Sequence, residues 1–405
     1  MIQIAILGFG VVGSGTAEVL TQNKALIEER LGCEVNIKYI LDLRDFPDSP
    51  FADRIVHDFN VILQDPDVSI VAEMMGGSHP AYDFSKACLE AGKSVVTSNK
   101  EVVSKFGAEL LALAKAKGAR YLFEASVGGG IPIIRPMIND LCSNRIASVN
   151  GILNGTTNYI LTQMKSTGQS FEAALRDAQK KGYAEANPTA DVEGIDAARK
   201  IAILAALSFG KLIYPDTVAA EGITALTTPI IEAADAMGYA VKLIGHTEQI
   251  DGRILAMVSP RLVPASNPLA GVDDVFNGIL VNANMVGDVM FYGPGAGKLP
   301  TASAVVADII DIIAHRHAQV KAPEWQTAKE DDVYPVAAYA CEYGVMLQGG
   351  EADVPALIEA LGERSYRVLD GVISFVTEAV TPDELEAMLK PCGLPVVAAL
   401  RLLNV

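Results

Sequence analysis

The chain has 405 residues, of which 50% are hydrophobic and 20% charged, so it is long and apolar enough to bury the cores of two or three domains. Its formal net charge of −17 would repel phosphate backbones and anionic lipid surfaces, which argues against a nucleic-acid or membrane partner. The five cysteines are scattered without CxxC spacing, Met1 opens no basic and apolar leader, and no apolar run reaches the roughly 18 residues of a membrane span, so we expect a cytoplasmic protein.

The first third of the chain alternates strand-like and helix-like segments. The apolar run from Ile2 to Leu7 leads into a glycine-rich turn and then into a helix-like segment. Such alternation predicts a Rossmann-type, doubly wound parallel sheet of the α/β class. Further strand-like runs lie at residues 35–41, 61–63, 69–74, 94–97 and 120–124, and helix-like segments such as 80–92 and 105–118 separate them.

The turn after the first strand has the pattern G-x-G-x-x-G. After a buried strand and before a helix, this pattern predicts a dinucleotide site: the first glycine permits the tight turn, the second lets a pyrophosphate approach the backbone, and the third packs helix against strand. The predicted cofactor-binding residues of the turn are Gly8, Phe9, Gly10, Val11, Val12 and Gly13.

The second predicted strand ends at Asp42 and Arg44, which make opposite demands on the cofactor. A carboxylate there would hold a ribose 2′-hydroxyl and argues for NAD, whereas an arginine would pair with a 2′-phosphate and argues for NADP. Arg44 is equally consistent with a solvated loop residue near Asp45 and Asp48. The sequence therefore leaves the choice between NADP and NAD open.

Beyond about residue 130 the pattern changes to a mixture of strands and helices that is typical of an α+β domain. A polar segment that contains prolines follows the helix-like stretch at 301–317 and is predicted to be a linker. The predicted domains are residues 1–130 with about 293–317 for the dinucleotide, 131–292 for substrate binding and dimerisation, 318–335 as the linker, and 336–405 as a small βα module.

The candidate chemistry rests on lysine. Oxidation of an alcohol by a nicotinamide needs a group that exchanges the hydroxyl proton, and a lysine can lose its proton near neutrality when it is desolvated. The five histidines show no zinc-ligand spacing. Lys100 directly follows the strand at 94–97, at the edge of the sheet where ligands collect. Lys200 lies four residues after Asp196 on a predicted helix, so the two side chains share one face.

An Asp–Lys pair at this spacing is usually a surface ion pair worth roughly a few tenths of a kcal/mol. The loop that enters the same helix, however, carries Glu185 and Asp191. Together with Asp196 and Lys200, these carboxylates can bind an α-ammonium and leave one lysine to handle a hydroxyl proton. These four residues are therefore the predicted substrate and catalytic site.

Six segments occur in the order of the signature blocks of homoserine dehydrogenases: GFGVVGSG, TSNKE, FEASVGGGIPIIRP, NGILNGTTNYILTQM, KKGYAEANPTADVEGIDAARKIAIL and YGPGAGKLPTASAVVADI. They span about residues 1–317, and the blocks around 154–158 and 191–200 are specific to that family. The chain thus resembles the NAD(P)-dependent enzymes that interconvert L-homoserine and L-aspartate 4-semialdehyde in threonine and methionine biosynthesis.

The resemblance implies roles for the predicted site residues. Lys200 would be the proton donor and acceptor, and Lys100 would lie beside nicotinamide and substrate. Glu185 would bind substrate, supported by Asp191 and Asp196. One departure is Asn187, where family members more often carry Asp.

The resemblance also implies three features that lie outside this cluster. A monovalent cation, usually sodium, would be bound by carboxylate or main-chain oxygens of Glu124, Val127, Gly129 and Ile131. A glycine-rich return segment would close over the cofactor with Gly297 nearest to it. The protein would form a homodimer or a homotetramer built on the sheet of the substrate domain.

Longer members of the family end in an ACT domain, a small βαββαβ ligand-binding module, and residues 336–405 resemble a degenerate one in outline. The segments VAAYAC, DVPALIEAL, GVISFVTE, TPDELEAMLK and PVVAALRLL read as strand, helix, strand, helix and strand. In such a module, an Arg-Pro-Gly type turn after the first strand offers backbone amides to an effector's carboxylate. Here the stretch 348–353 has two carboxylates and no arginine, and the short segment ERSYRVLDG predicts a missing or abbreviated strand. We expect packing or oligomerisation rather than threonine binding, with a redrawn effector site as the alternative.

Two other functions are compatible with the dinucleotide-binding pattern. A different, phosphorylating semialdehyde dehydrogenase would need a nucleophilic cysteine, but Cys88 lies inside a predicted helix and Cys142 follows an apolar run. A non-catalytic nucleotide-sensing protein would have no use for both lysines and the three carboxylates. Turnover with homoserine distinguishes these functions.

Overall fold

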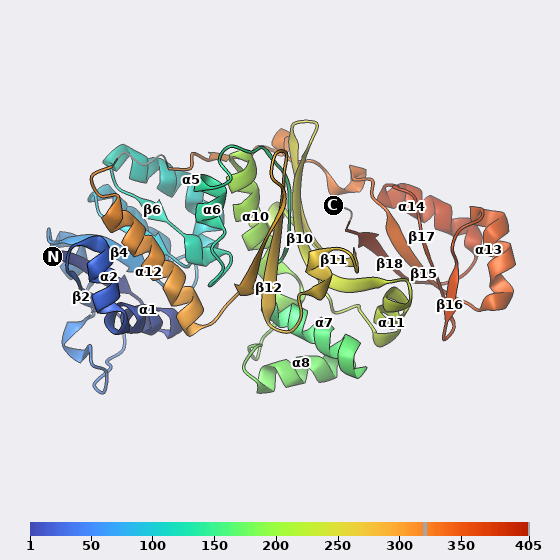
Figure 1. Ribbon diagram of the computed structural model, residues 1–405, viewed down its shortest axis with the longest axis horizontal. Coiled ribbons are helices and arrows are strands. Elements are labelled where there is room, and N and C mark those ends of the chain that lie inside the picture. Colours follow the sequence, from blue (N-terminus) through green and yellow to red (C-terminus); the bar gives the residue numbers. More distant parts are fainter. Residues whose placement is uncertain (319–321, 404–405) are drawn as a thin grey trace. The chain divides into compact units, whose positions relative to one another are not determined.

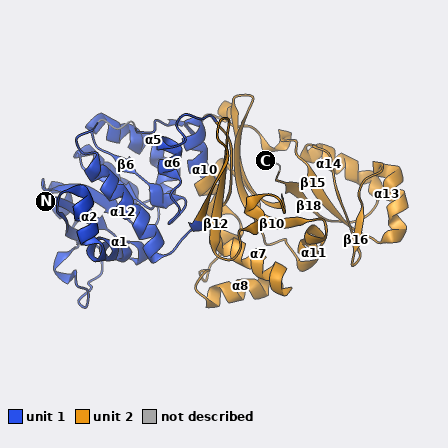
Figure 2. Ribbon diagram, viewed as in Figure 1, with its two compact units in different colours: residues 1–145, 202–215, 293–328 blue, residues 146–201, 216–292, 329–405 orange. Residues whose placement is uncertain are grey.

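The computed structural model describes residues 1–318 and 322–403 (Figure 1). The chain divides into two compact units (Figure 2): unit 1 comprises residues 1–145, 202–215 and 293–328, and unit 2 comprises residues 146–201, 216–292 and 329–405. Residues 319–321 of the predicted linker lie outside the described residues. No helix within the described ranges is long and apolar enough to span a membrane.

Unit 1 contains a six-stranded parallel sheet, as the sequence predicts. The order β3-β2-β1-β4-β5-β6 places β1 and β4 next to each other at the centre, where the direction of winding reverses. In such sheets ligands bind at the carboxyl ends of the strands beside this reversal. The strands are β1 (Ile2–Leu7), β2 (Val35–Leu41), β3 (Ile55–Val56), β4 (Val68–Glu73), β5 (Ser94–Thr97) and β6 (Tyr121–Leu122).

β1 and β4 are mostly apolar and largely buried, as expected of parallel strands that are covered on both faces. The return helix α12 (Lys298–Ala314) packs against α1 (Val11–Gln22) so closely that a Cβ at Gly15 would lie 2.8 Å from the carbonyl oxygen of Lys298. The other helices of unit 1 are α2 (Lys24–Leu31), α3 (Phe59–Gln64), α4 (Ala81–Glu90), α5 (Lys100–Lys117) and α6 (Ile134–Asn139). Two short strands, β8 (Lys211–Leu212) and β14 (Gln326–Thr327), pair in parallel at its periphery.

The strand predicted at residues 61–63 is wrong, because these residues lie within α3. Asp58 caps that helix, and its carboxylate accepts a hydrogen bond from the Asn60 amide at 2.9 Å. A run of three apolar residues is compatible with a strand and with the buried face of a helix. The capping residue Asp58 favours the helix here. The next strand in the chain after β2 is β3, before this helix.

Unit 2 contains a ten-stranded sheet, whose strands follow the path β13-β12-β7-β10-β11-β18-β15-β17-β16, with β9 beside β11. Its centre is the long hairpin of β10 (Tyr239–Ile250) and β11 (Arg253–Pro264), which Asp251 and Gly252 close (Figure 1). Both turn residues have positive φ, 50° and 79°, as a two-residue turn between twisted strands requires. The neighbouring strands are β7 (Ile146–Ile152), β9 (Ala219–Ala220), β12 (Phe276–Ala283) and β13 (Gly287–Pro294).

Five helices complete the first part of unit 2. They are α7 (Gly155–Thr167), α8 (Phe171–Lys180), α9 (Thr189–Val192), α10 (Ile195–Phe209) and α11 (Thr228–Ala236). Helix α10 begins in unit 2 and continues into unit 1, since the boundary between the units falls after Ile201.

The C-terminal module has the complete βαββαβ order. Its elements are β15 (Tyr343–Gln348), α13 (Val354–Leu361), β16 (Arg367–Leu369), β17 (Val372–Val376), α14 (Pro382–Leu389) and β18 (Val396–Leu402). The strand expected to be missing or abbreviated is β16, which has three residues. The strands of this module belong to the ten-stranded sheet of unit 2, because β18 pairs in parallel with β11.

The predicted strand VAAYAC is wrong, because Val336–Ala338 form a turn of 3-10 helix and the first strand begins at Tyr343. Pro335 precedes this turn, and the amides of Ala338 and Tyr339 bond back to the carbonyls of Pro335 and Val336. These local hydrogen bonds replace those of a strand.

Candidate functional site

The glycine-rich turn of unit 1 adopts the geometry that a dinucleotide requires. Gly8 has a φ of 88°, and a Cβ at Gly13 would lie 1.9 Å from the carbonyl oxygen of Gly8. In contrast, a Cβ at Gly10 would meet no atom within 4 Å, so the backbone there is open to an approaching pyrophosphate. Helix α1 begins at Val11, directly after Gly10, and points its amides and the positive end of its dipole toward this open side.

Asp42 and Arg44 contact each other at the end of β2. The Asp42 carboxylate accepts a hydrogen bond from the Phe9 amide at 2.8 Å and holds the Arg44 side chain through Nε at 3.0 Å and Nη2 at 3.1 Å. The hydrogen bonds from Arg44 lower the pKa of Asp42 to about 2. Asp42 is nearly buried, whereas the Arg44 side chain is 64% exposed. Asp42 thus supports the glycine-rich turn, and Arg44 can reach a ligand.

Lys100 is the first residue of α5. The preceding residue, Asn99, caps the helix: its side-chain oxygen accepts hydrogen bonds from the amides of Glu101 and Val102, both at 3.2 Å. Helix α5 follows β5, whose carboxyl end lies beside that of β4 in the central part of the sheet. Lys100 therefore lies at the carboxyl ends of the strands, as the sequence predicts. Its side chain is half-buried.

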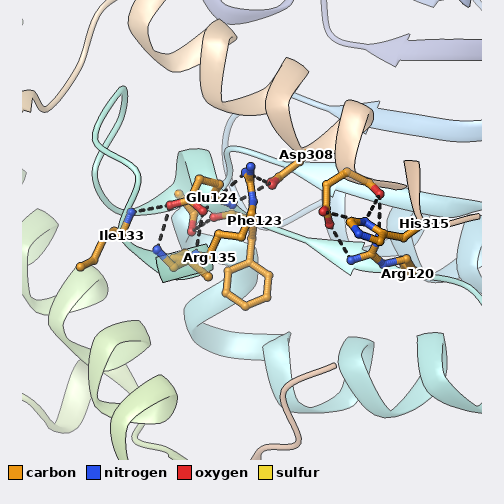
Figure 3. Close-up of polar contacts among 10 residues, drawn as sticks. Arg120, Phe123, Glu124, Ile133, Arg135, Asp308 and His315 are labelled. Carbon is orange, nitrogen blue, oxygen red and sulfur yellow. Dashed lines mark hydrogen bonds and ion pairs between the residues drawn. The ribbon is translucent and has the colours of Figure 1, made fainter. Parts of the chain in front are cut away.

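The proposed cation loop begins with a buried carboxylate, that of Glu124 (Figure 3). Glu124 is 2% exposed, and its two oxygens accept hydrogen bonds from the amides of Ile133, Ile134 and Arg135 at 2.7–2.8 Å. Asp308 of α12 accepts a hydrogen bond from the Glu124 amide at 2.9 Å. It also forms an ion pair with Arg135 at 2.8 Å. Burial raises the pKa of Asp308 to about 7, against the opposite effect of Arg135.

The glycine-rich return segment, residues 293–297, packs against the proposed cation loop. Gly129 has a φ of 58°, and a Cβ there would lie 2.3 Å from the carbonyl oxygen of Gly295, so only glycine fits. The amide of Gly130 donates to the carbonyl of Pro294 at 3.1 Å. Gly297, with a φ of 121°, ends the segment and immediately precedes α12.

Three of the four residues predicted as the substrate cluster meet in unit 2. The ammonium of Lys200 donates to Asp196 Oδ2 at 2.8 Å and to the main-chain carbonyl of Leu153 at 2.6 Å. Both side chains are buried, 8% and 7% exposed, so this is not a solvated surface pair. Asn154 links the rest: its Nδ2 donates to Asp191 at 2.7 Å and to Asp196 at 3.0 Å.

The family-specific stretch 154–158 explains why these groups meet. Asn154 caps α7, because its side-chain oxygen accepts from the Thr157 amide at 2.9 Å, and this leaves its side-chain nitrogen for the two aspartates. Gly155 must lack a side chain, since a Cβ would lie 2.5 Å from the carbonyl oxygen of Val275. Thr156 donates to the carbonyl of Tyr183 at 2.6 Å and fixes the loop that carries Glu185.

Glu185 is exposed, and its carboxylate is not part of the hydrogen-bonded cluster that the described residues form. Its main-chain carbonyl accepts a hydrogen bond from Gln179 at 3.1 Å. Asn187 shapes the same loop, because its side chain accepts from the amide and hydroxyl of Thr189. The sequence alone assigns no separate role to Asn154 and Thr156, whose side chains bond to the two aspartates and to the loop that carries Glu185. The Asn-Gly-Thr-Thr pattern of a capped helix after a strand was the available signal.

The arrangement combines two chemical capacities. Unit 1 offers an anion-binding helix start beside an open glycine, and unit 2 offers a buried amine that is bonded to Asp196 and to the Leu153 carbonyl, with Asn154 beside Asp196. A buried amine held at a defined position can exchange a proton with a hydroxyl, while carboxylates attract an ammonium.

Comparisons with known proteins match both parts of the chain. Residues 8–124 match the family model described as the NAD binding domain of homoserine dehydrogenase, and residues 132–310 match the model described as homoserine dehydrogenase. The homoserine dehydrogenase of Neisseria gonorrhoeae is 44% identical over 314 residues, which cover 77% of this chain and 72% of that protein. That of Bacillus subtilis is 41% identical over 319 residues, which cover 77% and 73%.

Solved structures show the same likeness. The crystal structure of a homoserine dehydrogenase from Thiobacillus denitrificans has a TM-score of 0.89 and 34% identity, and the match covers 100% of this chain and 98% of that one. A hyperthermophilic archaeal homoserine dehydrogenase in complex with NADPH has a TM-score of 0.66 and 28% identity, and covers 79% of this chain and 99% of its own. This chain belongs to the homoserine dehydrogenase family.

Proposed function

We propose that this chain catalyses the reversible, NAD(P)-dependent oxidation of L-homoserine to L-aspartate 4-semialdehyde, a reaction of threonine and methionine biosynthesis. The observation that carries the proposal is the buried Lys200 ammonium, held between Asp196 and the Leu153 carbonyl, with Asn154 tying Asp191 to the same cluster. Family membership supplies the substrate, and the cluster supplies a chemistry that fits it.

A nicotinamide bound to unit 1 would supply the acceptor for the hydride of the carbinol carbon. Lys200 accepts the proton of the homoserine hydroxyl as the neutral amine and becomes the ammonium, and in the reverse direction the ammonium returns that proton to the aldehyde oxygen. Asp196 orients the lysine through the 2.8 Å hydrogen bond between the two side chains. Because the oxidation releases a proton, it is measured most easily at alkaline pH.

The carboxylates bind the amino-acid end of the substrate. Glu185, on the exposed loop, attracts the α-ammonium, and Asp191 supports it. Asn154 positions Asp191 and Asp196 relative to each other, since one amide nitrogen donates to both.

Unit 1 binds the cofactor through the amides of the turn at 8–13 and the start of α1. Lys100 would lie beside the nicotinamide, and the return segment would close over the cofactor with Gly297 nearest to it. We expect use of both NADP and NAD, because Arg44 is exposed enough to pair with a 2′-phosphate, while Asp42 is nearby for a ribose hydroxyl. The structure of the archaeal relative with NADPH supports the NADP half of this assignment.

A monovalent cation, sodium in the family, would be held by Glu124 and by the main-chain oxygens of Val127, Gly129 and Ile131. The Glu124 carboxylate accepts hydrogen bonds from three amides and lies 3.6 Å from the Arg135 guanidinium, so a cation would join or replace Arg135 as the charged partner of this carboxylate. The hydrogen bonds of the loop use the carbonyl of Gly128 and the amides of Gly130 and Ile131. Oxygen ligands of this kind suit a hard cation, which would stabilise the loop against the return segment.

The alternative functions have less support. Cys88 is fully buried, and burial raises the pKa of its thiol to about 12, which is unsuitable for the nucleophile of a phosphorylating semialdehyde dehydrogenase. No observation favours a non-catalytic nucleotide sensor, for which the buried Lys200 cluster would be an unexplained cost.

The proposed reaction is tested by incubating the purified protein with homoserine and NAD⁺ or NADP⁺ at alkaline pH and recording reduced cofactor. We expect reduction of at least one cofactor, oxidation of the reduced cofactor by aspartate semialdehyde, and lower activity when choline replaces sodium. Absence of turnover in both directions with both cofactors would contradict the proposal. Equal activity in choline would contradict only the cation site.

A further inference from the structure

The last residue of β4, Glu73, carries a carboxylate for which the proposed mechanism has no use. It is completely buried, and burial raises its pKa to about 7. Its two oxygens accept hydrogen bonds from neutral donors, the Met75 amide and the Thr97 hydroxyl, each at 2.6 Å. Because both oxygens accept hydrogen bonds, this geometry suits the ionised carboxylate. A buried charge lowers the stability of the folded protein, and such groups concentrate at functional sites.

Glu73 lies where the cofactor crevice of such a sheet forms. In the parallel register, Leu7 pairs with Glu73 and Glu73 pairs with Thr97, so the three residues form one row across the carboxyl ends of β1, β4 and β5. Leu7 directly precedes the glycine-rich turn, and its carbonyl accepts a hydrogen bond from the Met74 amide at 2.9 Å. The row therefore joins the turn of the dinucleotide site to the strand that leads to Lys100.

Thr97 connects Glu73 to the start of α5 by hydrogen bonds. Its hydroxyl donates its proton to Glu73 and accepts a hydrogen bond from the Asn99 amide at 2.9 Å. The Asn99 side chain caps the helix and also donates to the carbonyls of Met75 at 3.1 Å and Gly77 at 2.8 Å. One connected network thus fixes the turn after β4 and the first turn of α5, in which Lys100 is the first residue.

We propose that Glu73 is a positioning residue for Lys100. The hydroxyl of Thr97 presents a lone pair to Asn99 because its own proton is committed to the Glu73 carboxylate, and Asn99 then holds the helix start in one place. Glu73 touches neither substrate nor cofactor in this account, and it acts through Thr97 and Asn99. The inference rests on the role proposed above for Lys100 beside nicotinamide and substrate.

The test uses the full-length protein and isosteric variants. Thr97→Val removes the relaying hydroxyl and keeps the side-chain shape, Thr97→Ser restores the hydroxyl, and Glu73→Gln keeps the volume but offers one acceptor fewer. Thr247→Val is the matched control, since Thr247 of β10 is equally buried and its hydroxyl makes one hydrogen bond, to the Leu255 carbonyl at 2.7 Å. Each variant is measured alone and in a Lys100→Ala background for kcat and KM with homoserine, with a thermal melt to confirm folding.

We expect Thr97→Val and Glu73→Gln to lower kcat/KM about tenfold, the size of coupling within one hydrogen-bond network, and Thr97→Ser and Thr247→Val to behave like the parent. In the Lys100→Ala background the same changes should cost less than about twofold, because the group that they position is gone. An equal loss in both backgrounds, or no loss in either, overturns the inference. If Thr97→Val fails to fold, Glu73→Gln provides the same comparison.

Failure of the inference is distinguishable from failure of the proposed function. A parent protein that does not turn over homoserine rejects the function. A parent that turns over homoserine while Lys100→Ala is as active as the parent rejects the role of Lys100, and the inference with it. A parent that depends on Lys100 but shows no coupling to Thr97 or Glu73 rejects the inference alone.

Discussion

At the scale of single residues, the end of β2 shows how one side chain can limit another. One carboxylate oxygen of Asp42 accepts a hydrogen bond from the Phe9 amide. Both oxygens accept hydrogen bonds from the Arg44 guanidinium. A ribose hydroxyl would have to compete with Arg44 for this carboxylate. A 2′-phosphate would instead attract the guanidinium away from Asp42, and Asp42 would keep its bond to the turn. The geometry therefore permits both cofactors, by two different uses of one pair.

Removal of the Arg44 guanidinium tests this view. We expect Arg44→Ala to raise KM for NADP⁺ several-fold to tenfold, because a charge-assisted hydrogen bond to phosphate is worth roughly 1.5–3 kcal/mol when fully made and less at an exposed site. KM for NAD⁺ should remain nearly unchanged or fall, since Asp42 is released for the ribose. Steady-state kinetics with both cofactors check this. Equal changes in the two KM values would show that Arg44 is a solvated loop residue.

At the scale of elements, the turn between β15 and α13 explains why an effector site is not expected in the C-terminal module. The carboxylate of Asp353 accepts a hydrogen bond from the Gly350 amide at 2.9 Å, and a Cβ at Gly349 would lie 3.0 Å from the same carboxylate oxygen. An amide of the loop is thus already bound to a carboxylate of the chain itself. A free amino acid would have to displace Asp353 and overcome its negative charge and that of Glu351.

We therefore predict that L-threonine at low millimolar concentration inhibits homoserine oxidation weakly or not at all. The measurement is a titration of threonine against the initial rate, with L-valine as a control amino acid of the same shape. Half-inhibition by threonine well below about 1 mM, a concentration that corresponds to roughly 4 kcal/mol of binding, would show that the module has a working effector site.

The elements also show what can be predicted from a sequence and what cannot. The parallel sheet was predictable because buried strands, a glycine-rich turn and amphipathic helices each leave a local pattern. Residues 61–63 and 336–341 were assigned wrongly because their conformation depends on hydrogen bonds of Asp58 and around Pro335, which outweigh a short apolar run.

The same distinction holds for the site. The pairing of Asp196 with Lys200 follows from their spacing of four residues on a helix, whereas its burial does not. Asn154 joins Asp191 and Asp196 across 37 and 42 residues of sequence, so its role exists only after the fold brings them together. Glu185 stays a prediction, because its carboxylate is exposed and outside the cluster in this structure.

At the scale of the whole molecule, we propose a homodimer or homotetramer. Strand β13 ends the sheet of unit 2, and apolar side chains remain exposed around it: Phe276 and Tyr292 stack at 5.3 Å and are 37% and 55% exposed, and Met285 is 79% exposed. Edge strands with exposed apolar residues are usually covered in the functional protein.

The mass of the protein in solution checks the assembly. Light scattering coupled to size-exclusion chromatography at micromolar concentration should give twice or four times the chain mass of 42.8 kDa. Met285→Lys and Tyr292→Lys should shift the protein toward the monomer, because a charge buried in an interface is costly. A parent protein with the mass of one chain would contradict the proposal.

In the proposed reaction the buried amine of Lys200 exchanges the proton of the homoserine hydroxyl, and removal of this amine tests that role. Lys200→Ala should lower kcat for homoserine oxidation by a factor of at least about 10², the usual size of a lost acid-base contribution, while binding of NAD(P)H in a fluorescence titration stays as in the parent. Lys165→Ala is the control in the same unit, since Lys165 forms an exposed ion pair with Asp235 at 2.7 Å, and it should keep the parent's kcat. Normal turnover by Lys200→Ala would contradict the account and reduce the Asp196–Lys200 pair to a structural one.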